Sequence, residues 1–398
     1  MIDTMNVAGL FSGIGGLELP FEAHGANTVL LCDAWDSSRS VLSAHFPDVR
    51  LSDDVRELDE LPDGVDIVTA GFPCTDLSQA GRMAGIRGEE SGLVEHVFRL
   101  LRAREVEWLV LENVRNMLVL DGGRAMSYLV SELEALGFRW AYRLVDSRFT
   151  GVPQRRHRVL LVASRHHDPR TVLFADEHGE PGSSIFRDDA FGFYWTEGLT
   201  GLGWAQDAVP PLKGGSGLGI PSPPAVWVPG ADTGRRLVTP CIEDAEALQG
   251  FERGWTAPAQ LDRRGKSARW KLVGNAVTVG VAEWLIGRLH RPGEVVVPHR
   301  RLNTPGRWPH AAYGTAGEVW KFEASSWPIR REYRHLLDLL TQDAANPLSQ
   351  RASAGFLSRV KRSRLRFVPE FLADLEQHVE YMASGDTHHG KKRRIAAA

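Results

Sequence analysis

The sequence predicts an α/β fold built on a doubly wound parallel sheet. From Met1 to about Ser164, short apolar runs alternate with amphipathic segments. Strands that alternate with helices are typical of a parallel sheet with helices on both faces. A glycine-rich turn after the first apolar run, with glycines at positions 13, 15 and 16, has the place that such folds use for nucleotide ligands.

Each element of this sheet follows from its residue pattern. Apolar runs of strand length predict strands at Asn6–Phe11, Thr28–Cys32, Asp66–Ala70, Trp108–Leu111, Trp140–Asp146 and Arg158–Ala163. Helical spacing of apolar residues predicts helices at Leu17–His24, Asp36–His45, Val94–Arg102 and Ala125–Leu136.

The regular pattern ends near residue 165. The stretches Gly198–Gly219 and Pro221–Pro224 are rich in Gly, Pro and Ser, which predicts loops and short strands of a second, smaller domain. Further on, helices are expected at Ile242–Leu248, Ala276–Leu289, Arg331–Leu340 and Pro369–Met382, and the last dozen residues are expected to be disordered.

Composition narrows the class of protein. The chain has 398 residues, a formal net charge of −3 and three cysteines, Cys32, Cys74 and Cys241. These cysteines are too few and too far apart for a disulfide framework or a CxxC zinc site. No apolar run approaches the roughly 20 residues that cross a bilayer. A reducing cytoplasm is therefore the expected compartment. Basic residues are clumped at 154–158, 263–266, 359–366 and 391–394, which leaves a nucleic-acid partner open.

One cysteine lies where catalytic groups are common. The segment G-F-P-C-T-D-L-S-Q-A-G, Gly71 to Gly81, follows the apolar run that ends at Ala70. A structural cysteine prefers the apolar run itself. Cys74 instead lies in a loop at the carboxyl end of an expected strand, where open α/β sheets place their chemistry.

Further blocks support a ligand site at the same sheet edge. Glycines after the first strand allow backbone N–H groups to approach a ligand, although a plain tight turn explains them equally well. Asp33 and Asp36 follow the second strand, where a carboxylate often binds ribose hydroxyls. Asp36 is alternatively the N-cap of the next helix.

Six blocks in order resemble one family, the DNA cytosine-5 methyltransferases. They are F-x-G-x-G-G from Phe11, G-F-P-C from Gly71, E-N-V from Glu112, Q-x-R-x-R from Gln154, L-Q-G-F from Leu248 and G-N-A-V from Gly274. Together they cover roughly residues 6–290. The resemblance implies a Rossmann-like sheet that binds S-adenosylmethionine, a smaller target-recognition domain and methyl transfer to carbon 5 of cytosine in DNA, with no metal.

The resemblance also assigns catalytic roles. Cys74 is the implied nucleophile at carbon 6, because a thiolate attacks well and leaves again. Glu112 would contact the Watson–Crick edge of the base, Arg158 its 2-oxo group, and Arg156 would support the same site. A base inside a duplex is out of reach, so the cytosine must flip out.

The implied cofactor pocket draws on the sequence blocks and on residues between them. Its residues are Phe11, Gly13, Gly15, Gly16, Asp33, Trp35, Asp54, Pro73, Leu93, Asn275 and Val277. The family usually has a ribose-binding glutamate directly before the Trp35 position, where this chain has Ala34, so either Asp33 or Asp36 takes that role. After the cysteine, the family's P-C-Q-P-F-S is replaced by Pro73-Cys74-Thr75-Asp76-Leu77-Ser78.

The implied domains are a catalytic domain at 1–164, a target-recognition domain at 165–270, a helix returning to the catalytic domain at 271–292, and an extension at 293–398. Candidate DNA contacts in the recognition domain are Trp195, Trp204, Lys213 and Trp227, although the tryptophans suit a small-domain core better. The extension is either a structural appendage or a clamp on the DNA backbone.

Three other functions compete with an active DNA methyltransferase. Relatives that act on tRNA carry a Cys-Phe-Thr tripeptide, and residues 165–235 hold no cysteine. A DNA-binding module without catalysis would leave Cys74, Glu112 and Arg158 unexplained. A nicotinamide dehydrogenase would not need the Pro73-Cys74 pair. The expected partners are double-stranded DNA and a restriction endonuclease that acts on the same DNA site. The protein is expected to be a monomer in the bacterial cytoplasm.

Overall fold

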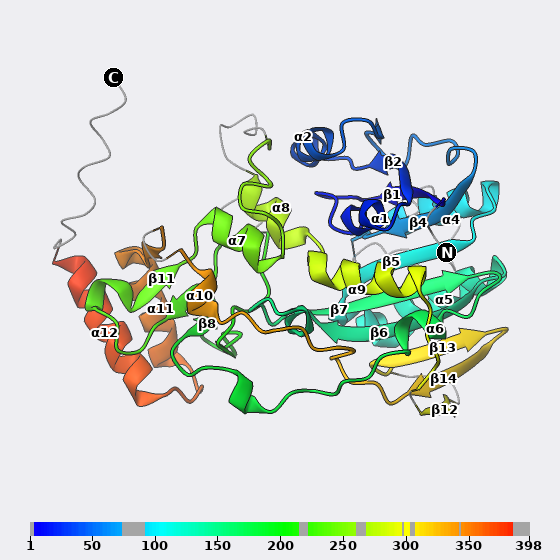
Figure 1. The fold of residues 1–398 in the computed structure, drawn as a ribbon. Helices are drawn as coiled ribbons and strands as arrows, with labels where there is room; N and C mark the ends of the chain where they lie inside the picture. The colour runs from blue at the N-terminus through cyan, green and yellow to red at the C-terminus, as the bar shows by residue number, and fades with distance from the viewer. Residues whose placement is uncertain are drawn as a thin grey trace, which may run out of the picture.

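A ten-stranded sheet forms the larger of two structural units (Figure 1). The computed structural model describes residues 4–73, 92–214, 222–259, 268–296, 298–302, 307–341 and 344–384. The strand order across this sheet is β12-β14-β13-β6-β7-β5-β4-β1-β2-β3. The bounds are β1 Asn6–Leu10, β2 Asn27–Cys32, β3 Arg50–Ser52, β4 Val65–Ala70, β5 Trp108–Val114, β6 Arg139–Asp146, β7 His157–Ser164, β12 His299–Leu302, β13 Ala311–Thr315 and β14 Glu318–Phe322.

The sheet is parallel in only one half. Strands β3, β2, β1, β4 and β5 run parallel to their neighbours. From β7 onward every pairing is antiparallel, including β6 with β13. The prediction of a wholly parallel sheet is therefore wrong for β6 and β7, because a direct β6–β7 connection of ten residues returns the chain antiparallel where a parallel pair needs a longer crossover.

Helices cover both faces of this sheet. Helix α4 (Leu93–Ala103) and α5 (Arg124–Ala135) bury Phe98 and Leu129 on one face. On the other face, α1 (Leu19–Ala23), α6 (Arg170–Leu173) and α9 (Val279–His290) bury Phe21, Leu173 and Leu285. Helix α2 (Asp36–His45) packs beside β3 at the parallel edge. Short 3-10 helices follow β5 and β6 at Arg115–Leu118, Leu120–Gly123 and Ser147–Thr150.

The helix expected at Ala276–Leu289 is confirmed as α9, with its start three residues later. Helix α8 (Arg269–Asn275) ends before Ala276, and α9 begins at Val279. The stretch Arg269–His290 is long and apolar enough to cross a membrane by length and composition, but 72% of its most apolar window is buried inside the protein. Such burial is what the core helix of a globular fold shows.

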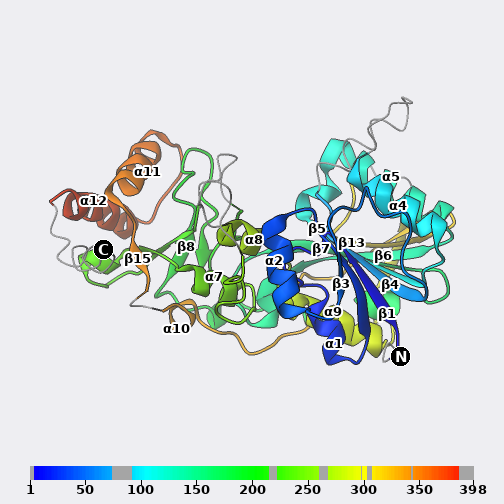
Figure 2. The same ribbon diagram turned by 90° about the horizontal axis from the view of Figure 1, so that it is seen from above.

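The second unit is a five-stranded antiparallel sheet in the order β15-β11-β10-β8-β9. Its strands are β8 Phe191–Phe193, β9 Ala205–Gln206, β10 Ala225–Trp227, β11 Leu237–Thr239 and β15 Asn346–Pro347. Its helices are α7 Ile242–Leu248, α10 Leu336–Leu339, α11 Gln350–Arg362 and α12 Pro369–Ala383, with a 3-10 turn at Thr233–Arg235, while the 3-10 turn Ser183–Ile185 packs against the large-sheet core. Both views place α11 and α12 at the end of the molecule away from the large sheet (Figures 1 and 2).

The chain after residue 292 contributes to both units. Strands β12–β14 extend the large sheet beyond β6, and Tyr142 donates a hydrogen bond to the Pro309 carbonyl at 2.8 Å. Residues 346–383 then complete the small sheet and cover it with two helices. The expected helix at Arg331–Leu340 is wrong except for the single turn of α10. The last residues of the chain, expected to be disordered, lie outside the described residues.

Candidate active site

Glu112 and Arg158 form a buried pair on neighbouring strands. Glu112 lies near the carboxyl end of β5, and Arg158 lies near the start of antiparallel β7. The Arg158 Nε atom is 2.9 Å from Oε1 of Glu112, with side-chain exposures of 14% and 9%. This contact is an ion pair without the alignment of a hydrogen bond, so Glu112 Oε1 has no hydrogen-bond donor. Burial lowers the pKa of Arg158, and the adjacent Glu112 carboxylate opposes that change.

Asn113 joins this pair to the cysteine loop. Its side-chain amide donates to the Phe72 carbonyl at 3.0 Å, and its Oδ1 accepts from the Val114 N–H at 2.8 Å. Phe72 is 3% exposed and meets the Phe11 ring edge-on at 6.5 Å. The chain therefore leaves the sheet at Pro73, which is exposed, from a fixed position beside Glu112. Cys74 itself lies outside the described residues.

Arg156 does not point toward the Glu112 pair; its guanidinium is directed at backbone carbonyls. Its guanidinium donates to the carbonyls of Leu212, Gly274 and Ala276 at 3.2, 3.1 and 2.8 Å. The side chain is 1% exposed, and burial lowers its pKa well below the usual value. Arg156 thus holds three chain segments together beside Arg158.

Two buried glutamines extend this network and explain two of the sequence blocks. Gln154 donates to Gln249 Oε1 and to the Leu248 carbonyl, each at 3.0 Å, and accepts from the Leu212 N–H at 2.9 Å. Gln249 donates to the carbonyls of Val273 and Ala276 and accepts from Thr278 Oγ1 at 2.8 Å. A buried polar network that satisfies its members fixes one arrangement of the segments.

The glycine-rich turn lies beneath the 276–279 connection. Gly13 has φ +58°, and a Cβ atom there would meet nothing within 4 Å, which leaves open space over the turn. A Cβ atom on Gly16 would lie 2.9 Å from the Val277 carbonyl oxygen, so this approach requires glycine. Gly15 and Phe11 also have positive φ, at +83° and +56°. Trp255 Nε1 donates to the Ile14 carbonyl at 3.0 Å and so packs against the glycine-rich turn.

Asp33 binds the turn from the end of β2. Its two oxygens accept from the Gly13 and Trp35 N–H groups, each at 2.9 Å. Burial raises the pKa of Asp33, and these backbone donors oppose that rise. The carboxylate therefore orients both the turn and the following aromatic residue, whatever ligand the turn binds.

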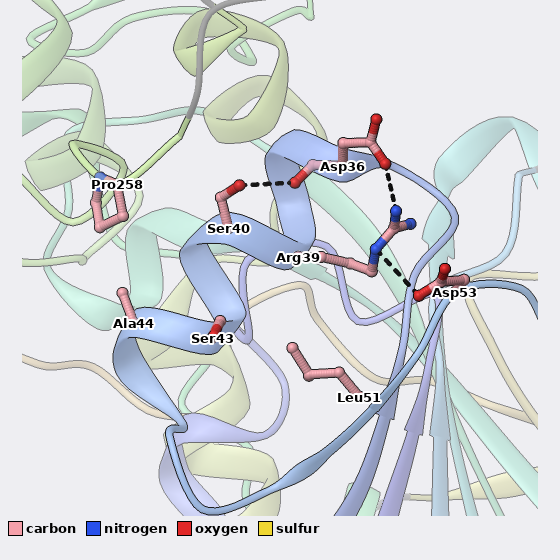
Figure 3. Close-up of a pocket in the computed structure, with 8 residues that line it drawn as sticks. All are labelled: Asp36, Arg39, Ser40, Ser43, Ala44, Leu51, Asp53 and Pro258. Carbon is pink, nitrogen blue, oxygen red and sulfur yellow. Dashed lines mark hydrogen bonds and ion pairs between the residues drawn. The ribbon is translucent and has the colours of Figure 1, made fainter.

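Asp36 is the exposed first residue of helix α2. Figure 3 shows Arg39 between the carboxylates of Asp36 and Asp53, beside a depression of about 590 Å³. Arg39 also donates to the Asp33 carbonyl at 3.0 Å. Asp36 is exposed and bound to Arg39, while both oxygens of Asp33 accept from backbone N–H groups at the glycine-rich turn and Trp35.

The other predicted pocket residues lie at the same sheet edge with varied surroundings. Trp35 is half-buried, with the Lys271 ammonium 4.0 Å from its ring centroid. Asp54 accepts from the Arg56 N–H and guanidinium, and the hydrogen bond from Arg56 lowers its pKa. Leu93 begins α4 and is partly buried, Val277 is half-buried, and Asn275 is exposed at the end of α8. Among the described residues, no group of three or more His, Cys, Asp and Glu could hold a metal ion.

The four candidate DNA contacts of the small unit are largely occupied in packing. Trp227 is 3% exposed and donates to Asp374 at 2.8 Å, and Trp204 stacks on Phe191. Trp195 donates to the Pro223 carbonyl at 2.8 Å. Lys213 is half exposed, with its ammonium 2.5 Å from Glu197 and above the Tyr194 ring.

Glu18 is a buried acid beneath the turn that the sequence blocks did not single out. It is 1% exposed, accepts from Thr69 Oγ1 at 2.6 Å, and leaves Oε2 without a donor. Burial raises its pKa to about 7, and nearby Asp33 adds to the rise. It stands between Leu17 and Leu19 just after the glycine-rich turn, and a single acidic residue there gave no signal in the sequence.

Comparison with known proteins agrees with this arrangement. A family model described as C-5 cytosine-specific DNA methylase matches residues 5–184. The chain is 44% identical over 385 residues to Type II methyltransferase M2.BsuMI of Bacillus subtilis, covering 94% of this chain and 98% of the relative. Type II methyltransferase M.MspI of Moraxella sp is 26% identical, covering 68% of this chain and 67% of that protein.

The fold has a solved counterpart as well. The S. pombe Dnmt2 methyltransferase matches with a TM-score of 0.52 at 14% identity, covering 72% of this chain and 98% of that structure. At this identity the match supports the fold alone, and it confirms the predicted methyltransferase-type α/β architecture. The similarity to M2.BsuMI along nearly the full length of both chains shows the family itself. This chain belongs to the C-5 cytosine-specific DNA methylase family.

Proposed function

We propose that this protein methylates carbon 5 of a flipped-out cytosine in a short duplex DNA site, using S-adenosylmethionine and a covalent cysteine adduct at carbon 6. The observation that carries the proposal is the arrangement around β5. Glu112 is paired with Arg158, while the adjacent Asn113 anchors Phe72, two residues before Cys74. One strand end thus connects a nucleophile loop with an acid and a guanidinium.

Each residue has a defined task in the reaction. The Cys74 thiolate forms a bond to carbon 6, and the ring electron pair moves toward carbon 5 and the 2-oxo group. Arg158 would stabilise charge on that oxygen, and the Glu112 carboxyl, 2.9 Å from Arg158, would contact ring nitrogen 3 and the amino group. Once carbon 5 carries the methyl group, loss of its proton to a base would restore the double bond and expel the thiolate. Arg156 would position Arg158 through the backbone.

The residues present fit the proposed cofactor. Open space above Gly13, the buried and unpartnered Ser12 hydroxyl, and Asp33 at the end of β2 form a polar cradle. The residues that would hold S-adenosylmethionine are Phe11, Gly13, Gly15, Gly16, Asp33, Trp35, Asp54, Pro73, Leu93, Asn275 and Val277. When bound, the cofactor supplies the methyl group as a sulfonium electrophile.

The proposal extends to the biological setting. The small unit would read the DNA site, and the enzyme would act as a cytoplasmic monomer in a bacterium. The name of M2.BsuMI, a Type II methyltransferase, supports a role beside a restriction endonuclease that cuts the same site.

Covalent capture tests the adduct directly. Duplex DNA with 5-fluorocytosine at the target should give a stable complex, because fluorine blocks the final elimination. Cys74→Ser should abolish capture, while Cys241→Ser, at a half-buried cysteine that caps α7, should retain it. Capture by Cys74→Ser would refute the nucleophile assignment. Capture of fluorinated RNA and not DNA would replace the proposed substrate.

A second experiment tests the role of Glu112, and sequencing of methylated DNA identifies the recognised site. Glu112→Gln should slow single-turnover methyl transfer by at least about 100-fold with little change in DNA affinity. The matched control is Glu105→Gln, at an exposed carboxylate just before β5. Sequencing 5-methylcytosine in host DNA that expresses the wild-type gene should reveal one short motif. Absence of new methylation with folded enzyme and cofactor present would contradict the proposed function.

A further inference from the structure

The segment between Asp343 and Glu370 is strongly basic. Residues 344–369 hold no acidic side chain and six basic ones, within a chain whose formal net charge is −3. The six are Arg351, Arg359, Lys361, Arg362, Arg364 and Arg366. Such local charge makes a polyanion the natural partner even on a protein that is nearly neutral overall.

Helix α11 separates structural residues from charged ones. Phe356 and Val360 face the aromatic core of the small unit and are 0% and 5% exposed. Arg359 serves the same packing, because it donates to the Trp195 and Glu197 carbonyls at 2.7 and 2.9 Å. Arg351 and Arg362 are exposed, on the opposite side of the helix from Phe356.

The chain after α11 continues this pattern in an extended form. Leu365 and Phe367 pack against the core, whereas Arg364 and Arg366 alternate with them and are exposed. Residues two apart in an extended chain lie about 6.6 Å apart on one side. Two guanidinium groups are therefore presented in a row to solvent, directly after Arg362.

Neighbouring acidic side chains do not neutralise most of these charges. Lys361 pairs with Glu376 at 2.7 Å, but both side chains are about half exposed. For Arg351, Arg362, Arg364 and Arg366, the part of the chain that the structure describes offers no acidic partner, and Arg362 donates only to the Ser358 carbonyl. Exposed arginines without acidic partners are free to bind phosphate in bidentate fashion.

We propose that Arg351, Arg362, Arg364 and Arg366, the α11 basic surface, bind the phosphodiester backbone of duplex DNA outside the recognised site. The inference rests on the proposed function for the identity of the polyanion. Both views place this surface on the small unit, at the end of the molecule away from the large sheet (Figures 1 and 2). Phosphate contacts there would lengthen the footprint and fix orientation without reading sequence.

The test compares two triple variants of the full chain. R362Q/R364Q/R366Q removes three charges from the surface. The matched control, R300Q/R301Q/R307Q, removes three exposed arginines from and near β12, at the other end of the molecule. Affinity is measured by fluorescence anisotropy for duplexes carrying one target site with either short or 20-base-pair flanks, at several salt concentrations.

For the surface variant, we expect affinity for the long-flank duplex to fall about tenfold or more. The slope of log affinity against log salt should become shallower by about 0.9 for each lost contact. The short-flank duplex and the maximal methylation rate should change little, and the control should match wild type. An unchanged salt slope on the long duplex, or an equal loss in the control, would overturn the proposal. A surface variant that loses affinity for RNA but binds the long-flank duplex like wild type would also overturn the proposal.

The binding readout keeps the two proposals separable. If wild-type protein binds duplex DNA with the expected slope but methylates nothing, the proposed function fails and the surface assignment stands. If methylation proceeds and the surface variant binds like wild type, only the surface assignment fails.

Discussion

Replacing Glu18 by Gln should change how the stability of the protein depends on pH. Glu18 is 1% exposed beneath the glycine-rich turn, and burial raises its pKa from 4.5 to about 7. Between these values the folded protein keeps the proton while the unfolded chain releases it. The stabilisation from Glu18 is therefore complete below pH 4.5 and is lost as pH rises through 7.

The magnitude follows from the size of that rise. A change from 4.5 to about 7 is worth roughly 3 kcal/mol, at about 1.4 kcal/mol for each tenfold change in the ionisation constant. Glutamine has nearly the same shape, still accepts from Thr69 and carries no charge at any of these pH values. Wild type should thus lose about 3 kcal/mol of stability through Glu18 between pH 4.5 and 8, and Glu18→Gln should not show this loss.

The assay is urea unfolding of wild type and variant at pH 4.5, 5.5, 6.5, 7.5 and 8. The free energy of unfolding of the variant should rise relative to wild type as pH increases. Glu22→Gln is the control, because Glu22 lies one turn further along and is exposed. Parallel pH profiles for wild type and Glu18→Gln would refute the assignment of a buried, protonated carboxyl.

Three further substitutions test how the site is assembled. Asn113→Ala removes the amide that anchors the start of the cysteine loop, and should slow single-turnover methyl transfer about 10- to 100-fold, with a loss of stability of about 1–3 kcal/mol because the buried Phe72 carbonyl loses this donor. Arg156→Met removes the guanidinium donor from the buried Leu212 and Gly274 carbonyls and one of two side-chain donors from Ala276, and should lower the free energy of unfolding by about 3 kcal/mol; unchanged stability of Arg156→Met would contradict its role in joining these segments. Gly16→Ala brings a methyl group to 2.9 Å from the Val277 carbonyl, and should cost about 1–3 kcal/mol in urea unfolding and weaken S-adenosylmethionine binding measured by calorimetry.

Sequence patterns predicted the parallel half of the large sheet closely, except for the short edge strand β3. Helix α2 has the predicted bounds, Asp36–His45, because a polar start and a regular apolar stripe mark it. The strands β12–β14 were missed: they are short, and His299–Leu302 is largely exposed at the sheet edge, so no apolar run marks it. At Arg331–Leu340 the apolar residues have helical spacing, but only one helical turn forms, and its leucines pack into the small-unit core.

The site was predictable as a set of residue types and not as a set of contacts. Glu112 and Arg158 could be named because their blocks are distinctive, and the two side chains do meet. Arg156 is two residues from Arg158 and has the same chemistry, yet it is directed at carbonyls of Gly274 and Ala276, more than a hundred residues away. Such long-range partners depend on tertiary packing, which local spacing does not encode.

The division of the chain after residue 292 between the two units constrains how new specificities can arise. A cassette exchange confined to residues 165–270 would bring in foreign strands but keep β15, α11 and α12, whose apolar side chains fit the present core. Recombination would have to replace two separate stretches together and leave β12–β14 between them untouched, since these cover β6. Specificity in this architecture should therefore diverge by point changes in surface loops more readily than by shuffling of whole modules.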